Sequence, residues 1–169
     1  VTDESGNEVV LLPEIIFSNK QNINWNDVED YLGKYVGELI EIAETRDIIY
    51  IGNKFPDEYG GSSYTRKTKG ARAKAKANAA QGIREMVEIA TDKIYRENHK
   101  EKHSEDAHNG WFYYVTRFAI PLYNNEKKTG EYNVYSACLV VNHAANGKMY
   151  LYDVVGIKKE ASNPLKTIK

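Results

Sequence analysis

Three runs rich in aromatic and β-branched residues fill the second half of the chain and restrict its fold more than any other feature. They cover residues 111–123, 132–143 and 148–157, and polar segments separate them. The last two runs are joined through Asn146-Gly147, a dipeptide that strongly predicts a two-residue hairpin turn. The pattern therefore predicts three antiparallel strands that follow one another as a meander.

Alternation along these strands predicts which side chains share a face of the sheet. Four apolar residues of the first strand are expected to face the core: Phe112, Tyr114, Phe118 and Ile120. The opposite, open face is expected to carry Arg117, Tyr150, Tyr152 and Lys158. Strict alternation also predicts Val154 on this open face and Asp153 on the other.

The first half of the chain has helical periodicity instead. Apolar residues recur every three or four positions over residues 25–45, after the capping residue Asn24, and again over residues 71–91. Residues 48–52 are predicted as a strand, residues 55–70 as a loop because of Pro56 and a Gly-Gly pair, and residues 93–110 as a polar connector.

Together these elements predict the α+β class, with two principal helices packed on one face of a four-stranded, mostly antiparallel sheet. We expect an N-terminal arm over residues 1–24, a single domain over residues 25–160 and a C-terminal tail over residues 161–169.

Length and composition agree with one stably folded domain. The chain has 169 residues, of which 41% are apolar, enough to bury a core without metal or disulfide support. Its single cysteine, Cys138, excludes a disulfide framework within the chain. No apolar run approaches the roughly 18 residues of a membrane span. Because Val1 is not a natural start residue, we expect a fragment of a longer protein.

Charge is distributed in blocks although the net charge is only −1. Residues 1–58 hold 13 acidic and 4 basic residues, whereas residues 59–84 hold 7 basic residues and no acidic one. Such an acid-free segment attracts phosphate groups, but it is equally consistent with a solvated helix face balanced by the acidic first block. On the first interpretation, the RNA-binding residues are Ser63, Arg66, Arg72, Lys74 and Lys76.

The residue types needed to cleave RNA without a metal are also present. The reaction requires a base, an acid and a cation that stabilises the charge on the phosphorane. We predict His103 as the acid or base with His108 as the alternate, Arg117 and Lys158 as the cations, and Tyr152 as the residue that orients the phosphate.

Two further assignments complete the predicted site. Trp111 directly follows a glycine and is predicted to stack on a base, although a tryptophan that begins a strand is more often a core residue. His99 and His103 are four residues apart, but lysines flank both and no cysteine is near. We therefore predict no metal site and no cofactor.

Several strings resemble a C-terminal domain of large polyvalent proteins carried by phages and conjugative elements of gut bacteria. These strings are FPDEY at 55–59, SYT at 63–65, AKAKANAAQ at 73–81, GWF at 110–112, RFA at 117–119, YLYD at 150–153 and KKE at 158–160. Similar domains form the tips of contact-dependent toxins. The resemblance spans roughly residues 25–160.

The resemblance implies a nuclease of the barnase, EndoU, colicin and RelE-like group, which cleaves RNA, including tRNA, without metal. It further implies a monomeric toxin domain of a larger secreted or phage-delivered protein that acts in the cytoplasm of a target bacterium. An acidic immunity protein that covers residues 66–76 is then the expected partner. The alternative is a non-catalytic module that binds nucleic acid or protein on the open sheet face.

Overall fold

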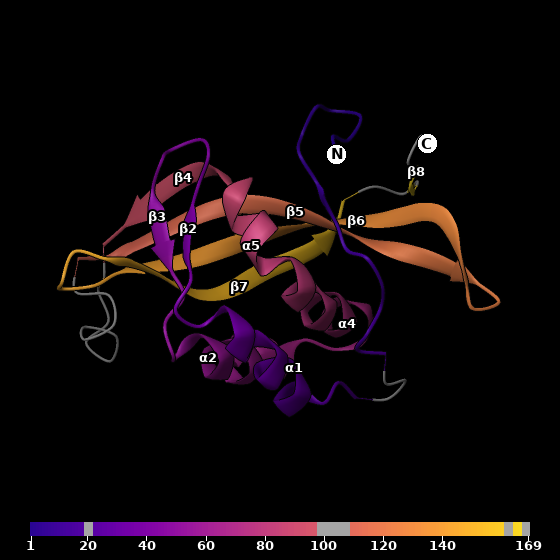
Figure 1. Cartoon of the computed structure of the whole chain (residues 1–169), viewed down its shortest axis with the longest axis horizontal. Coiled ribbons are helices and arrows are strands. Elements are labelled where there is room, and N and C mark those ends of the chain that lie inside the picture. The colour runs from indigo at the N-terminus through magenta and orange to yellow at the C-terminus, as the bar shows by residue number, and fades with distance from the viewer. Residues whose placement is uncertain (19–21, 98–108, 161–163, 167–169) are drawn as a thin grey trace.

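Three long antiparallel strands form the centre of the molecule (Figure 1). The computed structural model describes residues 1–18, 22–97, 109–160 and 164–166. The long strands are β5 (Trp111–Asn124), β6 (Lys127–His143) and β7 (Met149–Lys159), so the predicted meander is confirmed. The connection between β6 and β7 covers residues 144–148, so it is longer than a two-residue turn. Within it the Gly147 amide donates a hydrogen bond to the Ala144 carbonyl, and Gly147 adopts φ +85°, in the left-handed region.

Five short strands extend this meander into an eight-stranded mixed sheet, so the predicted four-stranded, mostly antiparallel sheet is wrong. Two of the pairings are parallel, namely that of β1 (Val10–Leu11) with β5 and that of β3 (Ile48–Tyr50) with β7. The remaining short strands form antiparallel pairs. β2 (Leu39–Glu41) pairs with β3, β4 (Thr91–Arg96) pairs with β5, and β8 (Leu165–Lys166) pairs with β6.

Only β3 among the short strands matches a predicted one. β1 lies in the expected arm, β2 in the expected first helix, β4 in the expected connector and β8 in the expected tail. Each contains two to six residues, which is too short for an alternating pattern to stand out. Pairing with a neighbouring strand, rather than their own sequence, therefore determines that these segments are strands.

The predicted helix over 25–45 ends early. Helix α1 (Trp25–Leu32) begins at Asn24, whose side chain accepts hydrogen bonds from two backbone amides as expected for a cap. It is followed by the 3-10 turn η1 (Gly33–Tyr35), and Gly37 then adopts φ +95°. After this glycine, Ile40 is buried and its neighbours Leu39 and Glu41 are exposed. This alternation has the two-residue period of a strand, not that of a helix.

Residues 55–70, predicted as a loop, form two short helices. Helix α2 (Phe55–Gly61) has Pro56 in its first turn, where a proline needs no amide partner. Helix α3 (Ser63–Lys67) begins at Ser62, whose hydroxyl accepts a hydrogen bond from the Thr65 amide at 3.2 Å. The glycine and serine residues therefore cap and separate helices here.

The predicted helix over 71–91 is divided into α4 (Gly70–Ala79), η2 (Ala80–Gly82) and α5 (Ile83–Glu88). At Gly82 an added Cβ would lie 2.9 Å from Leu12 Cδ2, so glycine permits close approach of the N-terminal arm. Among the described residues no helix is both long and apolar enough to cross a membrane.

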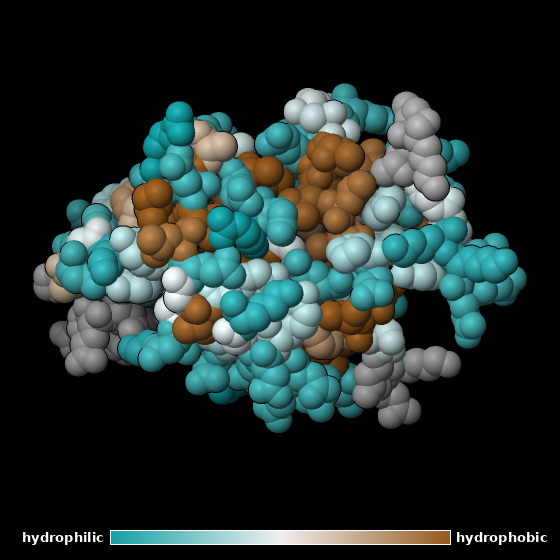
Figure 2. Space-filling model, in the orientation of Figure 1, coloured by the Kyte–Doolittle hydropathy of each residue, from teal (hydrophilic) through white to brown (hydrophobic). Residues whose placement is uncertain are grey.

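The helices gather on one side of the long strands (Figure 1), and the main core fills the space between them. Tyr114, Phe118 and Ile120 are buried there and Phe112 packs against them, which confirms the predicted core face of β5. Figure 2 shows an apolar patch over β2 and β3, where the side chains of Leu39 and Ile48 are exposed.

Asp47 connects the β2–β3 hairpin to β4 and β5. Its Oδ2 accepts hydrogen bonds from the Thr45 hydroxyl at 2.7 Å and the Tyr114 hydroxyl at 2.6 Å, and lies 2.8 Å from Lys93 Nζ. Burial alone would raise the pKa of Asp47, but the hydrogen bonds from Lys93, Tyr114 and Thr45 outweigh burial and lower it.

Asp47→Ala should reduce the free energy of unfolding by about 1.5–3 kcal/mol, because it removes hydrogen bonds to a charged group and leaves the buried Tyr114 hydroxyl without its acceptor. The depressed pKa means that this contribution is present above the unfolded-state pKa and disappears as pH falls through the folded-state pKa. Urea unfolding at neutral and acidic pH should therefore show the difference shrinking with acid. Asp30→Ala, at an exposed position on α1, should change stability little at either pH.

Candidate functional site

Helices α3 and α4 bring part of the basic segment to one groove of about 700 Å³, which we call the cationic groove. Arg66, Lys69 and Lys74 supply its positive charge, and Trp25, at the start of α1, lines it with a half-buried ring. The other lining residues are Ser18, Asn22, Ile23, Thr65, Thr68, Gly70, Ala71 and Ala73. None of the described residues that line the groove carries a carboxylate, so their charged side chains all have a positive charge.

The start of α4 adds to this positive field. The capping position Lys69 makes no side-chain hydrogen bond to the first turn of the helix. Gly70 adopts φ +60°, which glycine tolerates without strain, and an added Cβ there would meet open space. The first amides of a helix without a side-chain cap, together with its positive dipole end, favour an anion. None of the three cationic side chains forms an ion pair with another described residue.

The predicted RNA-binding residues divide between several environments. Arg66 and Lys74 line the cationic groove, and Lys69, which belongs to the same acid-free run but was not singled out, lines it too. Arg72 and Ser63 are exposed on α4 and α3 but do not line it. Lys76 is fully buried and does not belong to the groove.

Lys76 instead forms the central ion pair of the fold. Its Nζ lies 2.7 Å from Asp153 Oδ1 on β7 and 2.6 Å from the Thr65 hydroxyl on α3. The ammonium group also lies 4.6 Å from the ring centroid of Tyr59 and 5.0 Å from that of Tyr64. Burial lowers the pKa of Lys76 and raises that of Asp153, and the contact between the two groups opposes both shifts.

An irregularity in β7 brings Asp153 to this pair. Val140 is opposite Asp153 but Val141 is opposite Leu151, so one residue of β7, Tyr152, is extra. Val154 consequently lies in the main core and Asp153 contacts the helical layer. The prediction of Val154 on the open face is wrong, because strict alternation does not hold across a bulge.

Lys76→Met should destabilise the fold by about 3–5 kcal/mol, since it leaves the Asp153 carboxylate buried without its counter-charge. Adding Asp153→Leu to this variant should restore most of the loss, because the uncompensated charge is then gone. Urea unfolding of the two single variants and the double variant measures the coupling. Additive losses would contradict a mutual interaction.

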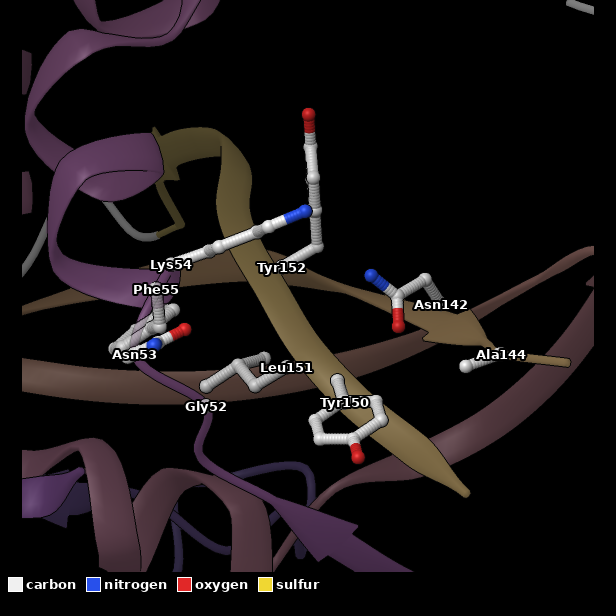
Figure 3. Close-up of a pocket in the computed structure, with 9 residues that line it drawn as sticks. All are labelled: Gly52, Asn53, Lys54, Phe55, Asn142, Ala144, Tyr150, Leu151 and Tyr152. Carbon is white, nitrogen blue, oxygen red and sulfur yellow. The ribbon is translucent and has the colours of Figure 1, made fainter. Parts of the chain in front are cut away.

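A second cavity, of about 260 Å³, lies where β6 and β7 approach the start of α2 (Figure 3). We call it the aromatic pocket. Figure 3 shows Asn142 on β6, Tyr150 and Tyr152 on β7, and Lys54 extended from the start of α2 toward β7. The other lining residues are Gly52, Asn53, Phe55, Ala144 and Leu151.

Asn142 is the unusual residue of this pocket. It is 7% exposed, and its Oδ1 is buried without a hydrogen-bond partner among the described residues. Buried carbonyl oxygens are nearly always satisfied, so such an atom next to a cavity is a candidate acceptor for a ligand. The sequence signal for this residue is an asparagine within the apolar run VVNH.

The pocket brings two predicted site residues together. Tyr152 lines it, and the ring centroid of Trp111 lies 5.0 Å from that of Tyr152 in an edge-on arrangement. Trp111 is itself buried and does not line the cavity. It therefore supports a pocket wall rather than offering a free stacking surface.

The predicted cations of β5 and β7 lie elsewhere. Arg117, Ser136 and Lys158 are opposite one another on adjacent strands, on the face turned away from the helices. Arg117 Nε lies 3.1 Å from Glu160 Oε1, and Lys158 is exposed. Neither residue lines the cationic groove or the aromatic pocket. His103 and His108 lie outside the described residues.

Comparisons with known proteins do not place the chain in a family. No protein-family model matches it, and no curated protein or solved structure matches it either. The resemblance to a domain of polyvalent proteins therefore stays a prediction. The two cavities and their chemistry are what a functional proposal can be built on.

Proposed function

We propose that the chain binds single-stranded RNA and that the cationic groove holds the sugar–phosphate backbone. One observation carries this proposal: three cationic side chains that form no ion pair with another described residue line a groove that also contains the start of α4. Phosphate oxygens match both features, since lysine and arginine neutralise their charge and helix amides donate hydrogen bonds to them. Trp25 adds a ring on which a base can stack.

The local field accounts for binding although the whole chain has a net charge of −1. Fixed charges act mainly within about 8–10 Å at physiological ionic strength, so the groove rather than the net charge determines what approaches it. An acidic immunity protein, the partner that the resemblance implies, would occupy the same groove and compete with RNA.

Metal-independent cleavage of the bound RNA is the activity that we propose for the chain. In this proposal His103 or His108 transfers the protons and Tyr152 orients the phosphate. Arg117 and Lys158 are given no part in it, because neither lines the groove or the pocket that would hold the RNA. One observation favours the non-catalytic alternative: among the described residues, which do not include His103 and His108, no histidine, aspartate or glutamate lines the groove or the pocket. Binding and cleavage therefore need separate tests.

Replacing Arg66, Lys69 and Lys74 together by glutamine should weaken binding of a single-stranded RNA oligomer, and more strongly at low salt. Each phosphate contact to a single strand contributes about 0.7 to the slope of log K against log salt, so the slope should fall by about 2. Fluorescence anisotropy over a series of salt concentrations measures it. Glutamine at Lys127, Lys159 and Lys166 removes equal charge from exposed positions outside the groove. An equal loss in this control variant would refute the groove.

Incubating the purified chain with total bacterial RNA in EDTA should give discrete fragments with 2′,3′-cyclic phosphate ends. His103→Ala or His108→Ala should reduce the rate by about 10²–10⁴-fold, the usual contribution of general acid–base catalysis. RNA that is bound but stays intact would favour the non-catalytic alternative. Mapping the fragment ends would also identify the bond that is cut.

A further inference from the structure

We propose that the aromatic pocket holds one base of the bound RNA and that Asn142 hydrogen-bonds its edge. This inference rests on the proposed RNA binding and adds a site for base recognition to it. The pocket and the groove lie along the same segment of the chain. Phe55 at the start of α2 lines the pocket, whereas Thr65 and Arg66 in α3 line the groove. A strand that follows α2 and α3 would contact both sites.

The first argument is the unsatisfied oxygen of Asn142. A buried carbonyl oxygen without a donor destabilises the free protein, and an apolar side chain of similar shape would remove that cost. Asn142 Oδ1 is the one buried side-chain nitrogen or oxygen of the described residues that has no partner. Because it lines a cavity, a ligand with an N–H or O–H group can supply the missing hydrogen bond.

Two walls of the pocket are tyrosine rings, and each of them contacts another aromatic ring. Tyr150 lies 5.7 Å from Tyr50 between ring centroids, and its hydroxyl accepts a hydrogen bond from Asn146 Nδ2 at 3.2 Å. Tyr152 is supported in the same way by Trp111. An added Cβ at Gly52 would lie 3.3 Å from the Tyr150 ring, so glycine at this position allows the ring to pack closely against the backbone. Fixed aromatic walls suit a flat aromatic ligand.

The size and polarity of the aromatic pocket also fit a single base. A cavity of about 260 Å³ is slightly below the roughly 300–1,000 Å³ of drug-sized ligand sites, so it suits one ring system better than a whole nucleotide. An asparagine amide offers an acceptor beside a donor, which matches the edge of a base and pairs best with adenine. Lys54 lines the same pocket, which favours a ligand attached to phosphate (Figure 3). Together these features point to a base of single-stranded RNA, which proteins read by stacking and edge hydrogen bonds.

The two tryptophans of the chain allow this site to be tested separately from the groove. Trp25 lines the groove and Trp111 contacts a wall of the pocket, so Trp25→Phe leaves a fluorophore that reports on the pocket. The probes are an adenine-containing RNA hexamer and an abasic hexamer with the same phosphates. We expect the adenine hexamer to change Trp111 fluorescence and to bind about tenfold more tightly, within the range measured for stacking of one base.

Asn142→Leu should then have two opposite effects. The melting temperature of the free protein should rise, because the unsatisfied oxygen is gone, and the preference for the adenine hexamer should fall below twofold. Asn133→Leu makes the same replacement on β6 outside the pocket and should leave the preference unchanged. Tyr150→Leu, which removes one wall, should abolish the preference even if Asn142→Leu does not fold.

The outcomes separate the two proposals. If both hexamers bind equally to the Trp25→Phe protein, or if Asn142→Leu lowers the melting temperature and keeps the preference, the base pocket is refuted while backbone binding stands. If the glutamine variant of the groove binds the abasic hexamer normally but adenosine still changes Trp111 fluorescence, the groove is refuted and base binding by the pocket is supported.

Discussion

The buried contact between Lys76 and Asp153 is the interaction on which the rest of this structure depends. Lys76 Nζ of α4 lies 2.7 Å from Asp153 Oδ1 of β7. Lys76 also donates a hydrogen bond to the Thr65 hydroxyl, so α3 contacts the same cluster. Tyr59 of α2 donates its hydroxyl hydrogen bond to the Lys76 carbonyl. Burying two charges costs free energy, so such a pair is better at fixing one arrangement than at increasing stability. Here it fixes the helices that carry both cavities relative to the sheet.

The position of the helices determines which side chains of the basic segment are exposed and which are paired within the fold. Lys76 is buried in its ion pair with Asp153, so it is not available to a phosphate. Arg84 lies 2.6 Å from Glu38 in an exposed ion pair outside the groove. Arg66, Lys69 and Lys74 remain on the side of α3 and α4 that forms the groove. The charge of the cationic groove therefore lies in the helical layer, whereas Arg117, on the opposite face, forms an ion pair with Glu160.

The sequence predicted elements correctly where a periodic pattern was long. It did not predict elements whose structure is determined by contacts between distant segments. The meander and the core face of β5 were predictable because this strand is fourteen residues long and alternate residues from Tyr114 to Ile120 are buried in the core. The helix predicted over 25–45 begins as expected but ends at Leu32, because glycines at 33 and 37 follow it. The short strands have no period of their own. Lys76 was predicted to bind RNA, but it is buried in an ion pair with Asp153, a partner 77 residues away that no local pattern indicates. The unsatisfied oxygen of Asn142 arises from tertiary packing, which no local pattern encodes.

The central claim is that one RNA strand occupies the cationic groove and the aromatic pocket together. The most direct measurement is a ¹⁵N–¹H correlation spectrum of the labelled chain with and without an adenine-containing RNA hexamer. The account predicts that the Trp25 indole and the Asn142 side-chain amide shift at the same RNA concentration. Shifts confined to the open face around Arg117 and Lys158, with Trp25 and Asn142 unchanged, would contradict it.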